Sequence, residues 1–272
     1  MKKITRVQKC LLHLAIVIAC LMLGTAHADE AYFNPHMNNF PDALRHPYVF
    51  MYGGVALFNT PANTQTITLT PGVDNRYSNP DFRHSQLQLG IGAGLLMRAS
   101  DQFLIQVGAS LFHIFNTTVN QGLVEPLINI MPGFDTLDYR YDINYIPVFA
   151  ELTIMSEHDW FGLHFRPYAV VGAGVSINEF KGYTEVATDP NSSATASPNS
   201  LFQNESLTQS AYELGAGFWF SINQHTKVTV DYRYMHLGDT RPATAAAQTT
   251  QTRLAVGNVD VHTFGLILLY IY

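Results

Sequence analysis

Charged side chains are few in this chain, and several stand in segments that otherwise alternate small and apolar residues. Charged residues make up 13% of the sequence, against about 25% in ordinary soluble domains. In an enclosed space such charges pair, because an isolated buried charge is costly. The pattern allows a structural ion-pair network, or a gate in which an arginine exchanges carboxylate partners to open a narrow ion path. The candidate residues are Arg98, Glu151, Arg166, Glu213, Lys227, Asp231 and Arg233.

Histidine and cysteine offer little further chemistry. Zinc sites usually appear in a sequence as histidines spaced i, i+4 on a helix or as histidines with cysteine partners. The eleven histidines of this chain are scattered and show neither pattern. Both cysteines, Cys10 and Cys20, lie near the amino terminus. We therefore expect no metal site, no cofactor and no disulfide framework.

The segments that must position these charges read as strands. Eight of them have strand character, and each can supply the roughly 9–11 residues of a tilted membrane strand. Short turns and long polar loops alternate between them, as in barrels with periplasmic turns and external loops. We predict an all-β fold, an eight-stranded antiparallel up-and-down transmembrane β-barrel, with strands near 48–58, 85–97, 102–115, 139–154, 161–177, 208–222, 227–238 and 259–272.

Alternation assigns the two faces of several strands. In segments 85–97, 208–222 and 227–238, apolar residues alternate with small or polar ones, so the apolar set is expected to face lipid. The carboxyl-terminal segment has an apolar face of the same kind and is predicted to close the barrel against 48–58. A lipocalin-like soluble barrel would reverse this polarity, and low charge argues against it. The residues of the carboxyl-terminal face are Phe264, Leu266, Leu268, Tyr270 and Tyr272.

The polar residues of segment 139–154 do not keep to one face of a regular strand. Asp142 and Asn144 are at even-numbered positions, whereas Glu151 and Thr153 are at odd-numbered positions. Because a one-residue slip moves a strand's side chains to the opposite face, we predict a β-bulge near Ile146-Pro147.

The first residues have the form of a secretory signal. Lys2, Lys3, Arg6 and Lys9 precede an apolar run from Leu11 to Leu23, followed by Ala26-His27-Ala28. We expect a removed signal peptide over 1–28, a periplasmic lead over 29–47 and the barrel over 48–272; lipidation at Cys20 is the alternative. Removal takes four of fifteen basic residues, leaving eleven against twenty-one acids, a net charge near −10. That charge argues against nucleic acid as a partner.

The loops are the candidates for binding. Segment 116–138 holds apolar residues that could form an exposed docking patch, represented by Leu123, Leu127, Ile130 and Phe134. The alternative is that the flanking strands extend beyond the membrane, or that the loop folds onto the rim. Loops 178–207 and 239–258 are polar and low in complexity, which predicts mobile segments that resist packing.

Short motifs resemble one family. Segments 166–174 (RPYAVVGAG), 212–217 (YELGAG) and 232–238 (YRYMHLG) are similar to strands 5, 6 and 7 of opacity-type, OmpA-like small outer-membrane barrels. The tail resembles the family's carboxyl-terminal assembly signal, which usually ends on Phe where this chain has Tyr272. The resemblance implies a monomeric eight-stranded barrel in the cell outer membrane of a Gram-negative-type envelope. Its implied partners are outer-membrane lipid, the barrel assembly machinery, and host-surface or envelope proteins.

The expected function is surface interaction, such as adhesion, or envelope integrity, without catalysis. A small gated ion pore is the first alternative. The second is a lipid A-modifying enzyme, since lipid A deacylases are also eight-stranded barrels with a His and a Ser two residues apart near the end of strand 7. Here Gly238 stands where that Ser would be, two residues after His236, so the imidazole has no hydroxyl to activate.

Overall fold

The computed structural model describes residues 45–60, 62–79, 82–100, 102–128, 136–156, 166–189, 202–223, 225–245 and 248–272. The expected signal peptide and most of the lead therefore lie outside the described residues. No helix in these ranges is long and apolar enough to cross a membrane. Ten strands are present: β1 (Arg45–Thr60), β2 (Asn63–Thr70), β3 (Val73–Asn79), β4 (Phe82–Arg98), β5 (Phe103–Ile128), β6 (Leu137–Ser156), β7 (Arg166–Ala187), β8 (Glu205–Ser221), β9 (Thr226–Thr240) and β10 (Gly257–Ile271).

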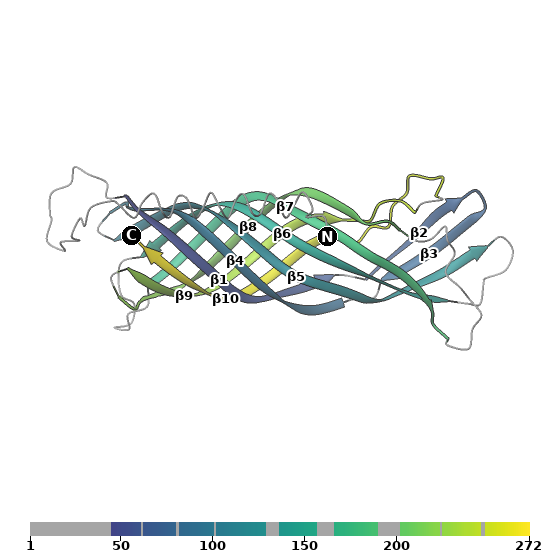
Figure 1. Cartoon of the computed structure of the whole chain (residues 1–272), viewed down its shortest axis with the longest axis horizontal. Helices are drawn as coiled ribbons and strands as arrows, with labels where there is room; N and C mark the ends of the chain where they lie inside the picture. Colours follow the sequence, from purple (N-terminus) through teal and green to yellow (C-terminus); the bar gives the residue numbers. More distant parts are fainter. Residues whose placement is uncertain are drawn as a thin grey trace, which may run out of the picture. The chain divides into compact units, whose positions relative to one another are not determined.

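Eight of these strands form a closed antiparallel barrel (Figure 1). Neighbours in sequence pair around the wall from β4 to β10, and β10 returns to pair with β1 from Ile271 opposite Tyr48 to Val261 opposite Phe58. The β1–β4 pairing completes the circuit. The eight predicted strands and the closing role of the carboxyl-terminal segment are confirmed.

Side chains alternate across the wall as predicted. On β8, Leu214 and Phe218 point outward and are 52% and 47% exposed, while Glu213 and Trp219 point inward and are 0% and 1% exposed. The inward face needs small residues where strands and large rings crowd together. A Cβ on Gly92 would lie 2.2 Å from the ring of Phe50, which only glycine avoids.

The predicted β-bulge near Ile146-Pro147 is wrong. Both residues pair with β7 in unbroken register. The nearest shift in the β5–β6 register falls between Ile114 and Thr117, which pair with Tyr145 and Ile143, and its extra residue lies on β5 rather than on β6. Along all of β6 the odd-numbered side chains point inward. The polar residues therefore change sides without a change of strand phase. Glu151 and Thr153 point into the barrel, whereas Asp142 and Asn144, closer to the amino-terminal end of β6, point outward.

The strands continue into an ordered extension at the end opposite Tyr272. We define the extension as β2, β3, residues 122–128 of β5, 137–143 of β6, 180–187 of β7, and segments 202–205, 242–245 and 248–256. There β3 pairs with β5, and Phe202 bridges to Ala245. The amide of Thr249 donates to the carbonyl of Leu69 on the edge of β2. Figure 1 shows the β2–β3 hairpin standing beyond the barrel wall.

These contacts revise the predicted loops. The segment between β1 and β4 is largely a β-hairpin, and part of 239–258 packs rather than remaining mobile, with Leu254 and Val256 buried. The long β5 confirms the alternative in which strands flanking 116–138 extend beyond the barrel. Residues 190–201 of the low-complexity loop lie outside the described residues.

Candidate functional site

A single arginine holds three carboxylates in the lumen. Arg233 projects inward from β9, and its guanidinium lies 2.9 Å from Glu151 of β6, 3.0 Å from Glu213 of β8 and 2.7 Å from Asp231 of β9. All four side chains are 4% exposed or less. The inward alternation of three strands at one height brings them together. We call these four residues the lumenal quartet.

The other three predicted lumenal charges lie elsewhere. Arg166 and Lys227 lie over the ring of buried Trp219, at 4.8 Å and 4.5 Å from its centroid, near the carboxyl-terminal end of the barrel. Arg166 is paired with Trp219, six positions along β8 from Glu213, or about 20 Å at strand rise. A partner exchange between Arg166 and Glu213 is therefore out of reach. Arg98 is the last residue of β4 and is exposed.

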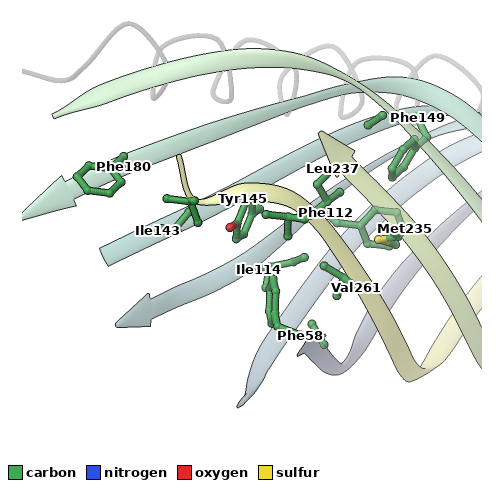
Figure 2. Packing of buried hydrophobic residues seen from close by; sticks show 14 of the residues in the cluster. Phe58, Phe112, Ile114, Ile143, Tyr145, Phe149, Phe180, Met235, Leu237 and Val261 are labelled. Atoms are coloured by element: carbon green, nitrogen blue, oxygen red, sulfur yellow. The ribbon is translucent and has the colours of Figure 1, made fainter. Parts of the chain in front are cut away.

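Large side chains fill the lumen around the quartet. The Arg233 guanidinium lies 5.2 Å from the centroid of Phe112, and Phe112 and Met235 have no exposed surface. Figure 2 shows these two residues with Phe149, Leu237 and Val261 converging in the interior. An eight-stranded barrel leaves space only for side chains, and here paired charges and rings occupy it. This packing opposes the gated-pore alternative.

The extension has an aromatic core, which belongs to the same buried hydrophobic cluster as the interior of the barrel. The ring of Phe202 meets Tyr77 edge-on at 5.5 Å and Tyr183 edge-on at 5.1 Å, and Tyr139 stacks on Tyr183 at 5.8 Å. Burial raises the pKa of the Tyr77 and Tyr139 phenols above the usual value. This core is not among the features predicted from the sequence, although the inward spacing of Tyr139, Tyr141 and Ile143 indicates it.

The outside of the extension is mainly polar and hydrogen-bonded. Arg76 of β3 pairs with Glu125 of β5 at 3.1 Å, and Arg140 donates to Thr184 at 3.0 Å. Two exposed apolar side chains lie on this polar face: Leu123 of β5, which is 39% exposed, and Val186 of β7, which is 55% exposed.

The predicted docking patch is only partly described. Leu123 is exposed, and Leu127 pairs with Asp74 of β3 in the β3–β5 ladder. Ile130 and Phe134 lie outside the described residues.

The residues weighed for catalysis lie on the outward face. His236 Nδ1 is 2.7 Å from Asp260, which is how a catalytic histidine is oriented. Gly238, with a φ of 74°, occupies the position where a nucleophile was considered. In the described ranges no serine or threonine hydroxyl is hydrogen-bonded to His236, and no group of three or more His, Cys, Asp or Glu residues is arranged to hold a metal ion.

Comparison with known proteins places the chain among outer-membrane β-barrels. The family described as outer membrane protein beta-barrel domain matches residues 50–271. No curated protein matches the sequence.

Similar solved structures include three such barrels. OprG of Pseudomonas aeruginosa is 19% identical, with a TM-score of 0.43 over 83% of this chain and 97% of that one. Ail of Yersinia pestis, solved with the heparin analogue sucrose octasulfate, is 11% identical, with a TM-score of 0.38 over 83% and 99%. Neisserial surface protein A is 13% identical, with a TM-score of 0.36 over 83% and 97%.

Proposed function

Because this chain belongs to the outer membrane protein β-barrel domain family, we propose that it is a non-enzymatic surface protein that binds a partner outside the cell through its extension. Membership gives the structure its orientation, since such barrels place short turns in the periplasm and long connections outside. The two shortest connections between barrel strands, four residues each after β4 and β8, lie at the end that carries Tyr272. The extension is then external.

The observation that carries the proposal is the internal order of the extension. A membrane-spanning barrel needs an apolar band only about 25 Å tall, and ordering further residues costs conformational entropy. Here that cost is offset by a buried aromatic core and by hydrogen bonds between segment 248–256 and β2. A rigid surface loses less entropy on binding than mobile loops do. These features support a recognition surface and also a role in envelope integrity.

The partner is proposed to be a host-surface or envelope protein. The polar outer face with its two exposed apolar side chains, Leu123 and Val186, has the mixed character of transient protein interfaces. Within the membrane, the partners are outer-membrane lipid and the barrel assembly machinery. The residues proposed to engage that machinery are Phe264, Leu266, Leu268, Tyr270 and Tyr272, of which the four from Phe264 to Tyr270 lie on the lipid-facing side of β10.

Binding by whole cells tests the proposal. Cells displaying the full chain would be compared with cells displaying a variant in which residues 63–79 are replaced by a short Gly-Ser linker, and with the double variant Leu123→Ser, Val186→Ser. We expect capture of host cells or isolated envelope proteins to fall with both variants. An Arg98→Gln variant, altered at the periplasmic end, is the matched control. Equal capture by all four would contradict the proposal.

Conductance separates the proposal from the pore alternative. Because the quartet and the surrounding rings occupy the lumen, we expect negligible steady current through the purified barrel in planar bilayers. Large, stable single-channel currents would contradict this expectation and favour the pore.

A further inference from the structure

A cluster of tyrosine, histidine and aspartate lies on the outward face of β8, β9 and β10. Asp260 accepts a hydrogen bond from the Tyr234 hydroxyl at 2.9 Å and pairs with His236 at 2.7 Å through the same oxygen, Oδ1. The Tyr212 ring stacks on His236 at 5.0 Å. Beside them, the Tyr232 hydroxyl lies 2.8 Å from His262 Nδ1.

The six side chains remain accessible from outside the barrel. Tyr212 and Tyr232 are 45% and 38% exposed, and the side chain of Asp260 is 47% exposed. Oδ1 of Asp260 makes both of these contacts, and no other hydrogen bond to this carboxylate is found among the described residues. We call this set the outward cluster; its members are Tyr212, Tyr232, Tyr234, His236, Asp260 and His262.

The height of the cluster places it at the outer membrane interface. Asp260 lies ten residues before Tyr270 on β10, and the outward residues between include Phe264, Leu266 and Leu268. Ten residues at about 3.3 Å each, tilted by about 40°, span roughly 25 Å, the height of the apolar band. Tyr270 and His225 stack at the periplasmic boundary. The outward cluster therefore meets the headgroups of the outer leaflet.

We propose that the outward cluster is a binding site for the saccharide headgroup of an outer-leaflet glycolipid. Sugar rings present hydroxyl groups that both donate and accept hydrogen bonds, along with apolar faces that stack on aromatic rings. The cluster offers the matching set: a carboxylate oxygen, phenol hydroxyls, imidazole nitrogens, and the rings of Tyr212 and Tyr232. This ordered array exceeds what a nonspecific aromatic belt requires, because belts need only amphipathic rings at the interface.

The chemistry favours sugar over phosphate. Phosphate sites are built from arginine, lysine or clustered backbone amides, whereas the outward cluster contains no arginine or lysine and includes a carboxylate. A site of this composition is expected to bind the glycolipid whether or not its phosphates are present.

Binding by the purified full chain in detergent micelles tests the proposal. Three probes would be titrated: lipopolysaccharide with a truncated saccharide, the same lipid after removal of its phosphates, and phosphatidylethanolamine. We expect the first two to bind, and both His236→Phe and Asp260→Asn to weaken this binding by about two- to tenfold, the range for one lost hydrogen bond. Phosphatidylethanolamine binding is expected to stay the same in all variants.

A histidine at the opposite boundary provides the matched control. His225 stacks on Tyr270 at 5.9 Å and 24°, much as His236 stacks on Tyr212, and His225→Phe should leave glycolipid binding unchanged. His236→Gln is the conservative variant, because it keeps a polar group toward Asp260. Heat-modified electrophoretic mobility would check that each variant is folded. The proposal is overturned if His236→Phe weakens binding no more than His225→Phe does. It is also overturned if removing the phosphates abolishes binding, since that identifies an anion site.

Discussion

The lumen at the quartet and the core of the extension both receive side chains from β6 but have opposite chemistry. In β6, Glu151 and Thr153 point inward near the quartet, and Leu152 and Ile154 point outward. In the extension, Tyr139 and Tyr141 point inward, and Arg140 and Asp142 point outward. The surrounding solvent explains the difference: lipid requires an apolar outer face, whereas water requires an apolar core to drive packing.

The largest effect is expected from breaking the quartet. Arg233→Met leaves three carboxylates buried without their cation, which should lower the free energy of unfolding by about 3–5 kcal/mol. Urea unfolding of the barrel in lipid vesicles would measure it. Arg98→Met, at an exposed site, should change stability by less than about 0.5 kcal/mol. A small loss in Arg233→Met would show that the quartet is not a coupled unit.

A combined variant sharpens the same point. Adding Glu151→Gln, Glu213→Gln and Asp231→Asn to Arg233→Met removes the uncompensated charge, so most of the lost stability should return. No recovery would mean that packing of the Arg233 side chain, rather than charge, accounts for the loss.

In the extension, the expected loss is local. Phe202→Ala removes a ring that contacts Tyr77 and Tyr183, and should destabilise the extension by about 3 kcal/mol, the lower end for such truncations. Faster hydrogen exchange in β2 and β3, with an unchanged urea midpoint for the barrel, would measure it. Leu123→Ala, at an exposed position, should leave exchange unaltered. Unfolding of the whole barrel would contradict the separation of the two regions.

Alkaline pH should loosen the extension. Burial raises the pKa of Tyr77 and Tyr139 in the folded state, so the unfolded chain loses these protons first. Stability is therefore complete below about pH 10, the unfolded tyrosine pKa, and falls above it by about 1.4 kcal/mol per pH unit for each tyrosine until the raised pKa is reached. Protease cleavage of the extension between pH 9 and 12 would test this. Tyr77→Phe should reduce the slope.

The smallest effects belong to ion pairs on the extension. Arg253 binds both carboxylate oxygens of Glu205, at 2.8 Å and 2.6 Å, and is partly buried. Arg253→Gln should cost about 1 kcal/mol, while Arg76→Gln, in the more exposed pair with Glu125, should cost less than about 0.5 kcal/mol. Thermal unfolding of the extension would rank them. The reverse order would mean that burial does not govern these contacts.

The membrane part of the fold could be predicted from the sequence because lipid constrains every outward position. Alternation in Leu214 to Phe220 and in Phe264 to Tyr270 depends only on strand period and the solvent. The extension could not be predicted in this way. Its inward aromatic residues and outward charges alternate like those of a soluble sheet. From the sequence alone, this alternation in β6 predicts a one-residue slip, whereas the structure shows a change of the surrounding solvent.

The candidate sites divide in the same way. Inward placement of Glu151, Glu213, Asp231 and Arg233 follows from alternation, but their convergence on one guanidinium depends on how three strands are staggered around the barrel. The same stagger places Arg166 over the ring of Trp219. It also places His236 beside Asp260, although the two residues are 24 apart in the chain. By itself the sequence determined which face each side chain takes, since that is a local property of the strand. Only the tertiary structure decided which of those side chains meet, because register between strands is set by contacts distant in the chain.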